Sequence, residues 1–465
     1  MPASAPPLAM LWPMSDETLT AEQPYVSPPP AQPVWGLAIA WSRDAPERIG
    51  EVFVLEGAEA ELGRGDGGEA PRMVLWRIRA GDARPQPPLV SRTLSRRQLV
   101  VRGGRQLRIT QAGKTPLKHR GRVVTEAVLH EGDVVEVENV LVLVAVRRQL
   151  SPAPLPRAYP TGPYGEADGF GMVGESTATW RLRSAVTSVA EQPGHVLVTG
   201  PSGAGKELVA AALHGLSERS GPLVARNAAT IPAALAEAEL FGNRANYPNP
   251  GMPERPGLIG QADGGTLLLD ELGDLPSSVQ AGLLRVLDAG EYQRLGEART
   301  RRSNLRVIGA THRGPEALKH DLRARFRHHL EVPGLADRPT DVPLLARHLL
   351  REASRQDPRL LRFFEGATPR LTPRFVHGLL RGPWETNVRQ LDAHLWEQLR
   401  TTDDPFLDAP EPPWTPVATT DPRSLDAATI RQALADCDGV VSHAWKALGL
   451  SSRDQLRRLM KKHGL

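Results

Sequence analysis

Hydrophobic residues follow three successive patterns along the chain, and each pattern predicts a different kind of structure. Residues 35–148 contain short apolar runs such as VWGLAIAW, MVLWRIRA and VVEVENVLVLVAV, which are separated by Gly-containing turns. No helical period lies between these runs, so they predict an all-β sandwich. In residues 171–335, apolar strands such as HVLVTG and TLLLDEL alternate with helical stretches such as KELVAAALHGL. This alternation predicts an α/β subdomain built on a parallel sheet, and residues 336–402 predict a helical subdomain after it.

Proline-rich segments separate these units, because closely spaced prolines prevent both helices and strand ladders. Residues 1–34 have the composition of a disordered leader, and residues 149–170 and 403–423 that of linkers. Residues 424–465 form a final small helical unit. We therefore expect a multidomain protein, as 465 residues also suggest.

Composition narrows the class of protein further. Hydrophobic residues make up 40% and charged residues 24%, which is typical of globular domains. The apolar run at 140–146 is far shorter than the roughly 18 residues that a membrane span requires. The N-terminus lacks the basic start and apolar stretch of a signal peptide, and the single cysteine, Cys437, has no partner for an internal disulfide. We expect a cytoplasmic protein with no membrane association.

Positive charge is concentrated in two places, although the net charge is only +4. Residues 92–122 contain ten Lys or Arg and no Asp or Glu. Arg457, Arg458, Lys461 and Lys462 are grouped at the C-terminal end. Such blocks are either solvated faces or surfaces for an anionic partner.

A glycine-rich loop between an apolar strand and a helix predicts a nucleotide site. The glycines of this loop allow backbone N–H groups to face phosphate oxygens, and the lysine adds a positive charge beside them. Sixty-four residues after this lysine, the strand TLLLDEL ends in Asp270 and Glu271, which predict a Mg²⁺ ligand and a base that polarises the attacking water. The predicted loop residues are Gly200, Pro201, Ser202, Gly203, Ala204, Gly205, Lys206 and Glu207.

The segment from MVGES (172–176) to NVRQL (387–391) resembles the AAA+ ATPase domain of bacterial enhancer-binding proteins, the activators of sigma-54 RNA polymerase. Glu207 after the lysine, ADGGTLLLDELGDLP (262–276) and DRPTDVPLLARHLL (337–350) also match that family. The resemblance implies an ATP-binding homo-oligomer, from a dimer to a hexameric ring. It assigns roles to five further residues: Val173 and Gly174 in nucleotide binding, Asn227 as the switch that holds back the catalytic glutamate, Arg325 as an arginine acting across subunits, and Arg389 at the γ-phosphate.

Three departures from the family pattern bear on activity. Where the family carries GAFTGA, which grips sigma-54, this chain has RANYPNPGMPE (244–254). His312 replaces the usual sensor asparagine, and Lys319 replaces the second arginine acting across subunits. An arginine finger is worth roughly 10³–10⁵ in rate, so a lysine there predicts ATP binding with slow turnover. Pro248 and Asn249 replace the family's Phe-Thr pair, so the gripping chemistry of the loop is lost. This loss argues against contact with sigma-54 and favours another form of the polymerase, although the overall resemblance still implies the sigma-54 form.

The C-terminal unit, LDAATIRQALADCDGVVSHAWKALGLSSRDQLRRLMKKHGL (425–465), is similar to Fis-type helix-turn-helix domains. The resemblance implies DNA binding by a dimer or larger assembly; a solvated helical hairpin is the alternative. The candidate DNA-binding residues are Ser452, Arg453, Gln455, Arg457, Arg458 and Lys461.

The N-terminal unit resembles a forkhead-associated (FHA) domain, a sandwich that binds phosphothreonine on partner proteins. The resemblance rests on ELGRGD (61–66), LSRRQLVV (94–101) and LHEGDVVEV (129–137), and it implies phosphate contacts by Arg64, Ser95 and Arg96. Gln98 replaces the family's histidine, and the chain has Gly-Lys-Thr where the family has Asn-Gly-Thr. A sandwich with a weakened pocket carries nearly equal weight.

Together, these features favour a DNA-binding transcriptional regulator with an FHA-like input domain and an ATP- and Mg²⁺-binding AAA+ module. The alternative is a phosphopeptide-binding scaffold in which ATP hydrolysis is vestigial. A remodelling ATPase that acts on other machines is disfavoured by the DNA-binding tail.

Overall fold

The computed structural model describes residues 33–65, 70–150, 152–313, 318–408 and 425–436, and beyond these 441, 444–445, 448, 450 and 453–463. Nearly all of the predicted leader and most of the second linker lie outside the described residues, as do Cys437 and Ser452. No helix in the described part of the chain is long and apolar enough to cross a bilayer.

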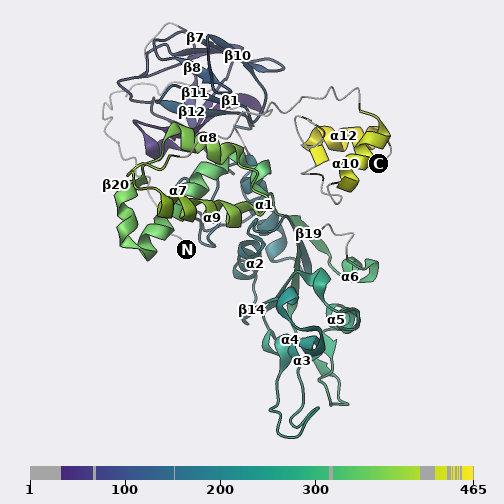
Figure 1. Ribbon diagram of the computed structural model, residues 1–465. Coiled ribbons are helices and arrows are strands. Elements are labelled where there is room, and N and C mark those ends of the chain that lie inside the picture. The colour runs from purple at the N-terminus through teal and green to yellow at the C-terminus, as the bar shows by residue number, and fades with distance from the viewer. Residues whose placement is uncertain are drawn as a thin grey trace, which may run out of the picture.

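Residues 34–148 form two antiparallel sheets, which confirms the predicted all-β region (Figure 1). The larger sheet has the strand order β5-β4-β2-β1-β12-β11-β8-β9, and the smaller has the order β10-β7-β6-β3. The strands are β1 (Val34–Ser42), β2 (Val52–Val54), β3 (Glu59–Leu62), β4 (Val74–Arg79), β5 (Asp82–Gln86), β6 (Leu99–Arg102), β7 (Leu107–Gln111), β8 (Leu117–His119), β9 (Arg122–Val124), β10 (Glu126–Leu129), β11 (Val134–Val137) and β12 (Leu141–Arg148).

Both faces of the central strands of the larger sheet are buried. Along β12, Leu141, Leu143 and Ala145 belong to the core between the two sheets. Val142 and Val144 belong instead to a second core, which the sheet shares with the helices α7 (Val342–Gln356) and α8 (Pro373–Arg381) that cover its outer face (Figure 1). This double burial explains why successive residues of β12 are apolar instead of alternating with polar ones.

The middle of the chain folds around a five-stranded parallel sheet, as predicted. Its strand order is β14-β15-β18-β13-β19, with β13 (Val196–Thr199), β14 (Leu223–Asn227), β15 (Thr266–Asp270), β18 (Arg306–Thr311) and β19 (His328–Glu331). The helices of this subdomain are α1 (Thr177–Ala190), α2 (Lys206–Gly215), α3 (Ala236–Phe241), α4 (Gly257–Gln261), α5 (Ser277–Ala289) and α6 (His320–Ala324). The short strands β16 (Glu291–Tyr292) and β17 (Arg301–Arg302) form a separate hairpin.

A helical subdomain follows and lies between the sandwich and the parallel sheet (Figure 1). It contains α7 (Val342–Gln356), α8 (Pro373–Arg381) and α9 (Asn387–Thr401), with a small ladder of β20 (Phe364–Glu365) and β21 (Thr368–Pro369). In the C-terminal unit, α10 (Ala427–Asp436) and α12 (Arg453–Lys462) share an apolar cluster that includes Ile430, Leu456 and Leu459.

Candidate functional site

The loop between β13 and α2 is closed around the ammonium group of Lys206. Lys206 Nζ donates to the carbonyl oxygens of Gly200 (3.0 Å) and Pro201 (3.4 Å). Gly203 and Gly205 have φ angles of 69° and 100°, which favour glycine. Burial lowers the pKa of Lys206 below its ordinary value. This loop before a helix N-terminus has the arrangement that receives phosphate groups.

The helical subdomain contacts the same loop. At the start of α9, Asn387 Nδ2 donates to Ser202 O (3.0 Å), the Val388 amide donates to Gly203 O (3.1 Å), and Arg389 Nη1 lies 3.4 Å from Ser202 Oγ. Arg389 therefore reaches the loop, and its role at the γ-phosphate stays a prediction. Asn387 was not singled out, although it stands in the same NVRQL motif.

Arg338 also binds the loop and was not predicted from the sequence. Its Nη2 donates to Ala204 O (3.1 Å), its Nε is buried without a partner, and burial lowers the pKa of its guanidinium. An arginine this deeply buried has little freedom to move, so it fixes the distance between the helical subdomain and the loop.

Asp270 lies at the carboxyl end of β15, opposite Asn227 of β14. Its Oδ2 accepts from Asn227 Nδ2 (3.3 Å), whereas its Oδ1 is buried without a protein partner. An unsatisfied carboxylate oxygen beside a phosphate loop suits a Mg²⁺ shell, because Mg²⁺ prefers oxygen ligands and retains several waters. The residues present therefore fit the predicted ion.

Glu271 is held by His312, not by Asn227. His312, just beyond β18, has its Nδ1 2.6 Å and its backbone amide 3.3 Å from Glu271 Oε2. Glu271 has a φ of 52°, a conformation uncommon for a residue with a side chain, so tertiary contacts must hold it there. The expected switch residue, Asn227, contacts Asp270 instead. The sequence contained one signal of this arrangement, a histidine at the sensor position.

Arg325 follows α6 and forms an ion pair within its own subunit. Its Nε lies 2.5 Å from Asp288 Oδ1 on α5, and both side chains are partly exposed. Among the described contacts, none joins Arg325 to the phosphate loop of the same chain. This placement is compatible with an arginine that acts on a neighbouring subunit.

The segment 172–176, which includes Val173 and Gly174, is fixed between α1 and the start of α7. Arg183 of α1 donates to the carbonyls of Met172 (2.9 Å) and Gly174 (2.8 Å). Gly174 has a φ of 146°, and a Cβ there would lie 2.6 Å from Asp341 Oδ2. Asp341 also accepts from the backbone amides of Glu175 and Ser176, each at 2.8 Å. The two residues predicted to bind nucleotide therefore stand in a tightly held turn.

The loop 244–254 forms an exposed turn at the end of the molecule remote from the sandwich (Figure 1). Its ends are joined by an antiparallel bridge between Asn243 and Arg255. Asn243 Nδ2 donates to Pro253 O (2.9 Å), and the Gly251 amide donates to Asn246 Oδ1 (2.8 Å). Side-chain amides thus stabilise the turn, which presents Tyr247 to solvent.

The candidate phosphopeptide residues are brought together by loops at one end of the sandwich. Arg64 and Arg96 are exposed, and the Arg64 amide donates to Ser95 O (3.1 Å). Gln98, where the FHA family has histidine, is buried; its Oε1 accepts from the Ser95 amide (3.3 Å) and its Nε2 donates to Thr115 O (2.7 Å). The glutamine thus joins the two loops that frame the site.

Acidic residues from elsewhere in the sandwich neutralise much of the basic stretch 92–122. Its ion pairs are Arg97–Glu61, Arg102–Glu59, Arg108–Glu126, Lys118–Glu138 and Arg120–Asp133. The stretch is therefore less positive in three dimensions than its sequence indicates, and it gives weaker support to an anion-binding face.

In the C-terminal unit, α12 carries exposed Arg457, Arg458 and Lys461. Arg457 Nη2 lies 3.8 Å from Glu331 Oε2 of β19. Arg453 and Gln455 belong to the same helix, but their side chains lie outside the described residues, as does all of Ser452.

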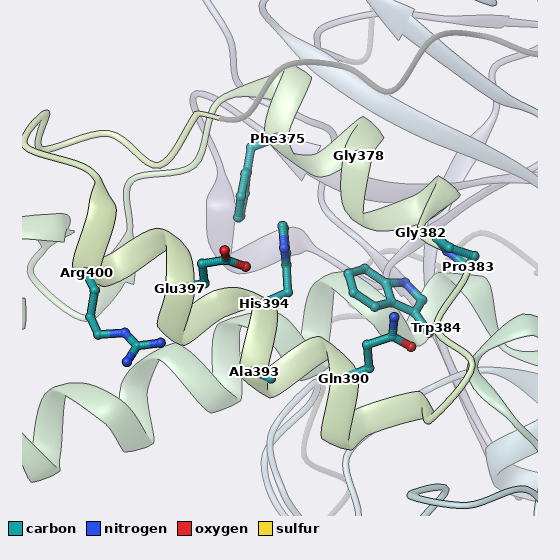
Figure 2. Close-up of a pocket in the computed structure, with 10 residues that line it drawn as sticks. All are labelled: Phe375, Gly378, Gly382, Pro383, Trp384, Gln390, Ala393, His394, Glu397 and Arg400. Atoms are coloured by element: carbon teal, nitrogen blue, oxygen red, sulfur yellow. The ribbon is translucent and has the colours of Figure 1, made fainter.

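A separate hollow of about 620 Å³ opens between α8 and α9 (Figure 2). In it, the ring of His394 stacks on Phe375 and lies 5.6 Å from the ring of Trp384. None of the residues that line it belongs to the phosphate loop, Asp270 or Glu271. The hollow is therefore distinct from the nucleotide site.

The parallel sheet, the glycine loop and the helical lid that contacts this loop define a P-loop fold of the AAA+ type. Residues 172–333 match the family described as the sigma-54 interaction domain. Transcriptional regulatory protein ZraR of Salmonella typhimurium is 33% identical over 320 residues, which span 64% of this chain and 70% of that protein. The nitric oxide reductase regulator NorR of Aeromonas salmonicida is 39% identical over 264 residues, 55% of this chain and 50% of that protein. The chain belongs to the family of sigma-54-dependent transcriptional regulators.

Among solved structures, NtrX from Brucella abortus in complex with ADP is similar to this chain. It is 30% identical and aligns with a TM-score of 0.46 over 64% of this chain and 70% of the NtrX chain.

Proposed function

We propose that the chain is an ATP-binding, DNA-binding transcriptional regulator whose AAA+ module works as a homo-oligomeric ring. The observation that carries the proposal is the convergence of three parts of the fold onto one site: the loop 200–207, the end of β15 with Asp270 and Glu271, and Arg389 on α9. A phosphate loop, a metal carboxylate, a base and a lid cation in one place are the groups that bind and hydrolyse a nucleoside triphosphate.

Within this site, each residue has a distinct task. The loop amides and Lys206 bind the β- and γ-phosphates, and Asp270 holds Mg²⁺, which neutralises phosphate charge when bound. Glu271 orients the attacking water as general base, for which it must leave or share its contact with His312. Arg389 detects the γ-phosphate from the lid.

Arginine supplied by a neighbouring subunit completes the site. Arg325 is the residue for this role, and its release from Asp288 would accompany ring assembly. Lys319, at the second position, is a more compact cation that lacks the planar fork of arginine, so we expect turnover to be slow.

ATP hydrolysis measured against protein concentration tests the ring. Turnover that rises cooperatively and disappears in both Glu271→Ala and Arg325→Ala would support it. Nucleotide binding without turnover at any concentration would refute the motor, whereas absence of binding would refute the nucleotide site itself.

We further propose that the C-terminal unit binds DNA through α12 and that the sandwich binds a phosphothreonine peptide. Support for the first comes from the exposed cations of α12, and for the second from the clustering of Arg64, Ser95 and Arg96. A gel shift with genomic fragments tests the first. Titration with phosphorylated and unphosphorylated threonine peptides tests the second, with Arg64→Ala as the variant expected to lose the difference between them.

We also propose that the loop 244–254 contacts RNA polymerase through Tyr247 and the prolines next to it. A pull-down of the ATP-bound protein is done once with RNA polymerase that carries sigma-54 and once with polymerase that carries another sigma factor. The comparison shows which form of the polymerase the protein binds. Replacement of the loop by Gly and Ser should abolish the interaction.

A second function, a phosphopeptide-binding scaffold, is favoured by the two contacts that restrain the catalytic groups: His312 on Glu271 and Asp288 on Arg325. In this alternative, ATP serves assembly alone. The scaffold predicts binding to phosphopeptide and ATP without any DNA shift.

A further inference from the structure

We propose that the N-terminal sandwich is an integral part of the nucleotide site, in which Arg79 acts as a positioning residue for the segment 172–176. The proposal rests on the nucleotide binding proposed above. It adds that a side chain from the sandwich determines the affinity of the AAA+ module for ATP.

Arg79, at the end of β4, reaches across to Glu175. Its Nε lies 3.2 and 3.1 Å from the two carboxylate oxygens, and its Nη2 lies 2.5 Å from Glu175 Oε1. The exposed fractions of the two side chains are 16% and 3%. A bidentate pair with so little solvent around it is directional, and it is screened far less than a surface pair.

Glu175 is held by this arginine at the position next to the predicted nucleotide-binding residues. Its carboxylate also accepts from the Gly165 amide (2.8 Å) and from Trp180 Nε1 (3.0 Å). Its own backbone amide donates to Asp341 at the start of the lid. One residue therefore joins the sandwich, α1 and the lid directly beside Val173 and Gly174.

A second arginine of the sandwich reinforces the same junction. Arg148, at the end of β12, donates from Nη1 to Thr177 Oγ1 (2.8 Å) and from Nη2 to Thr340 Oγ1 (3.3 Å). It is 6% exposed. Thr177 opens α1 and Thr340 precedes α7, so Arg148 joins the sandwich to both sides of the segment.

The remaining contacts between the sandwich and the lid are apolar and extensive. Val52, Val54, Trp76, Val142 and Val144 of the sandwich share one core with α7 and α8. Trp41 Nε1 also donates to Leu371 O (2.9 Å). Domains joined by a large apolar interface move together, whereas those joined by a small polar interface usually move independently. We therefore expect the sandwich and the lid to move as one unit, so that a displacement of one also displaces the other.

This arrangement predicts reciprocal coupling between the sandwich and ATP. If Arg79 favours the ATP-bound arrangement of the segment 172–176, ATP must by linkage stabilise the contact of Arg79 with Glu175. A ligand that displaces β4 would then change the affinity for ATP, and ATP would change the affinity for that ligand by the same factor.

Affinity for ATP, measured on the full chain by displacement of a fluorescent ATP analogue, tests the proposal. Arg79→Met keeps the aliphatic stem and removes the fork, and Glu175→Gln keeps the shape and removes the charge. We expect each variant to bind ATP at least about fivefold more weakly than the wild type. The double variant should bind ATP with the same affinity as the single variant that has the lower affinity, because both changes remove the same contact. Arg79→Lys should recover part of the affinity because it retains the charge. Arg84→Met on the neighbouring strand, whose partner Asp82 is exposed, is the control and should stay within about twofold.

Hydrogen exchange gives a readout that a purely structural role would not change. ATP should slow amide exchange in β4 of the wild-type protein and leave it unchanged in Glu175→Gln. Wild-type affinity in a folded Arg79→Met protein, or ATP that leaves β4 exchange unaltered, would overturn the proposal. Failure of the wild-type protein to bind ATP would instead refute the nucleotide site. If Arg79→Met does not fold, Arg79→Lys and Glu175→Gln decide between these outcomes.

Discussion

Asp341 is the residue whose replacement the structure predicts to be most damaging to the junction of the AAA+ module. It is fully buried, and its carboxylate accepts four hydrogen bonds. Two come from the amides of Glu175 and Ser176, each at 2.8 Å, and two from the hydroxyls of Ser176 and Thr179, each at 2.6 Å. All four donors lie on the segment that precedes α1 or on its first turn.

The cost of Asp341→Ala follows from the donors that cannot find a new partner. The hydroxyls of Ser176 and Thr179 are 3.2 Å apart and can hydrogen-bond each other once the carboxylate is gone. The two backbone amides have no such alternative, and each buried donor left unsatisfied costs about 2 kcal/mol. We therefore expect Asp341→Ala to lower the free energy of unfolding by about 4 kcal/mol. Asp341→Asn keeps Oδ1, the oxygen that accepts from both amides, so it should cost no more than about 1 kcal/mol.

Urea unfolding followed by tryptophan fluorescence measures this change, with the protein concentration held constant. Asp408→Ala is the matched control, because Asp408 also accepts from a threonine hydroxyl (Thr372, 2.7 Å) but is exposed. The control should lose no more than about 1 kcal/mol.

A loss of less than about 1 kcal/mol in Asp341→Ala would refute the reasoning, since it would mean that the two amides are hydrated or rearranged at no cost. An Asp341→Asn variant as unstable as Asp341→Ala would refute the argument that the two unsatisfied amides set the cost.

Three further predictions concern catalysis, pH dependence and DNA. Asp288→Asn should raise the rate of ATP hydrolysis up to about fivefold at concentrations that form rings, because an exposed pair holds Arg325 by at most about 1 kcal/mol; an unchanged rate in a phosphate-release assay would contradict this. Burial lowers the pKa of His195 below its ordinary value, so the stability that its neutral ring contributes is present above about pH 6.5 and is lost as the pH falls. The melting temperature of His195→Gln should consequently fall less steeply between about pH 7.5 and 5.5 than that of the wild type, and an equal slope would argue against a buried neutral ring. If Arg458 contacts a DNA phosphate, Arg458→Ala should reduce the slope of log affinity against log salt by about 0.9 in a binding titration, whereas an unchanged slope would exclude that contact.

Local sequence patterns were sufficient to predict the main elements. The alternation of apolar runs with turns in 35–148 and of strands with helices in 171–335 depends on neighbouring residues alone, and the sheets of the structure follow it. The nucleotide loop was predictable for the same reason, since its glycines, lysine and following helix are contiguous. The resemblance of the NVRQL motif implied a role for Arg389 at the γ-phosphate, which stays a prediction; in the structure Arg389 Nη1 lies 3.4 Å from Ser202 Oγ of the loop.

Pairings between distant residues were not predictable from these patterns. Asn227 was expected to restrain Glu271, yet the amide reaches Asp270, because β14 and β15 align these two residues side by side. His312 approaches Glu271 from the end of β18, the next strand on the other side. Which side chains meet at the edge of the sheet depends on strand order and register, which a single sequence does not specify.

The sequence by itself determined the kinds of elements, their order and the chemistry of the phosphate loop, because these depend on the periodicity and conformational preferences of adjacent residues. Only the tertiary structure decided that the outer face of the larger sheet is buried against the lid, that Arg79 reaches Glu175, and that Arg148 reaches Thr177 and Thr340. The successive apolar residues of β12 carried a signal that something covers the sheet, but not what covers it. Burial joins residues that are more than 90 positions apart along the chain, such as Arg79 and Glu175, and only the packed fold brings such residues together.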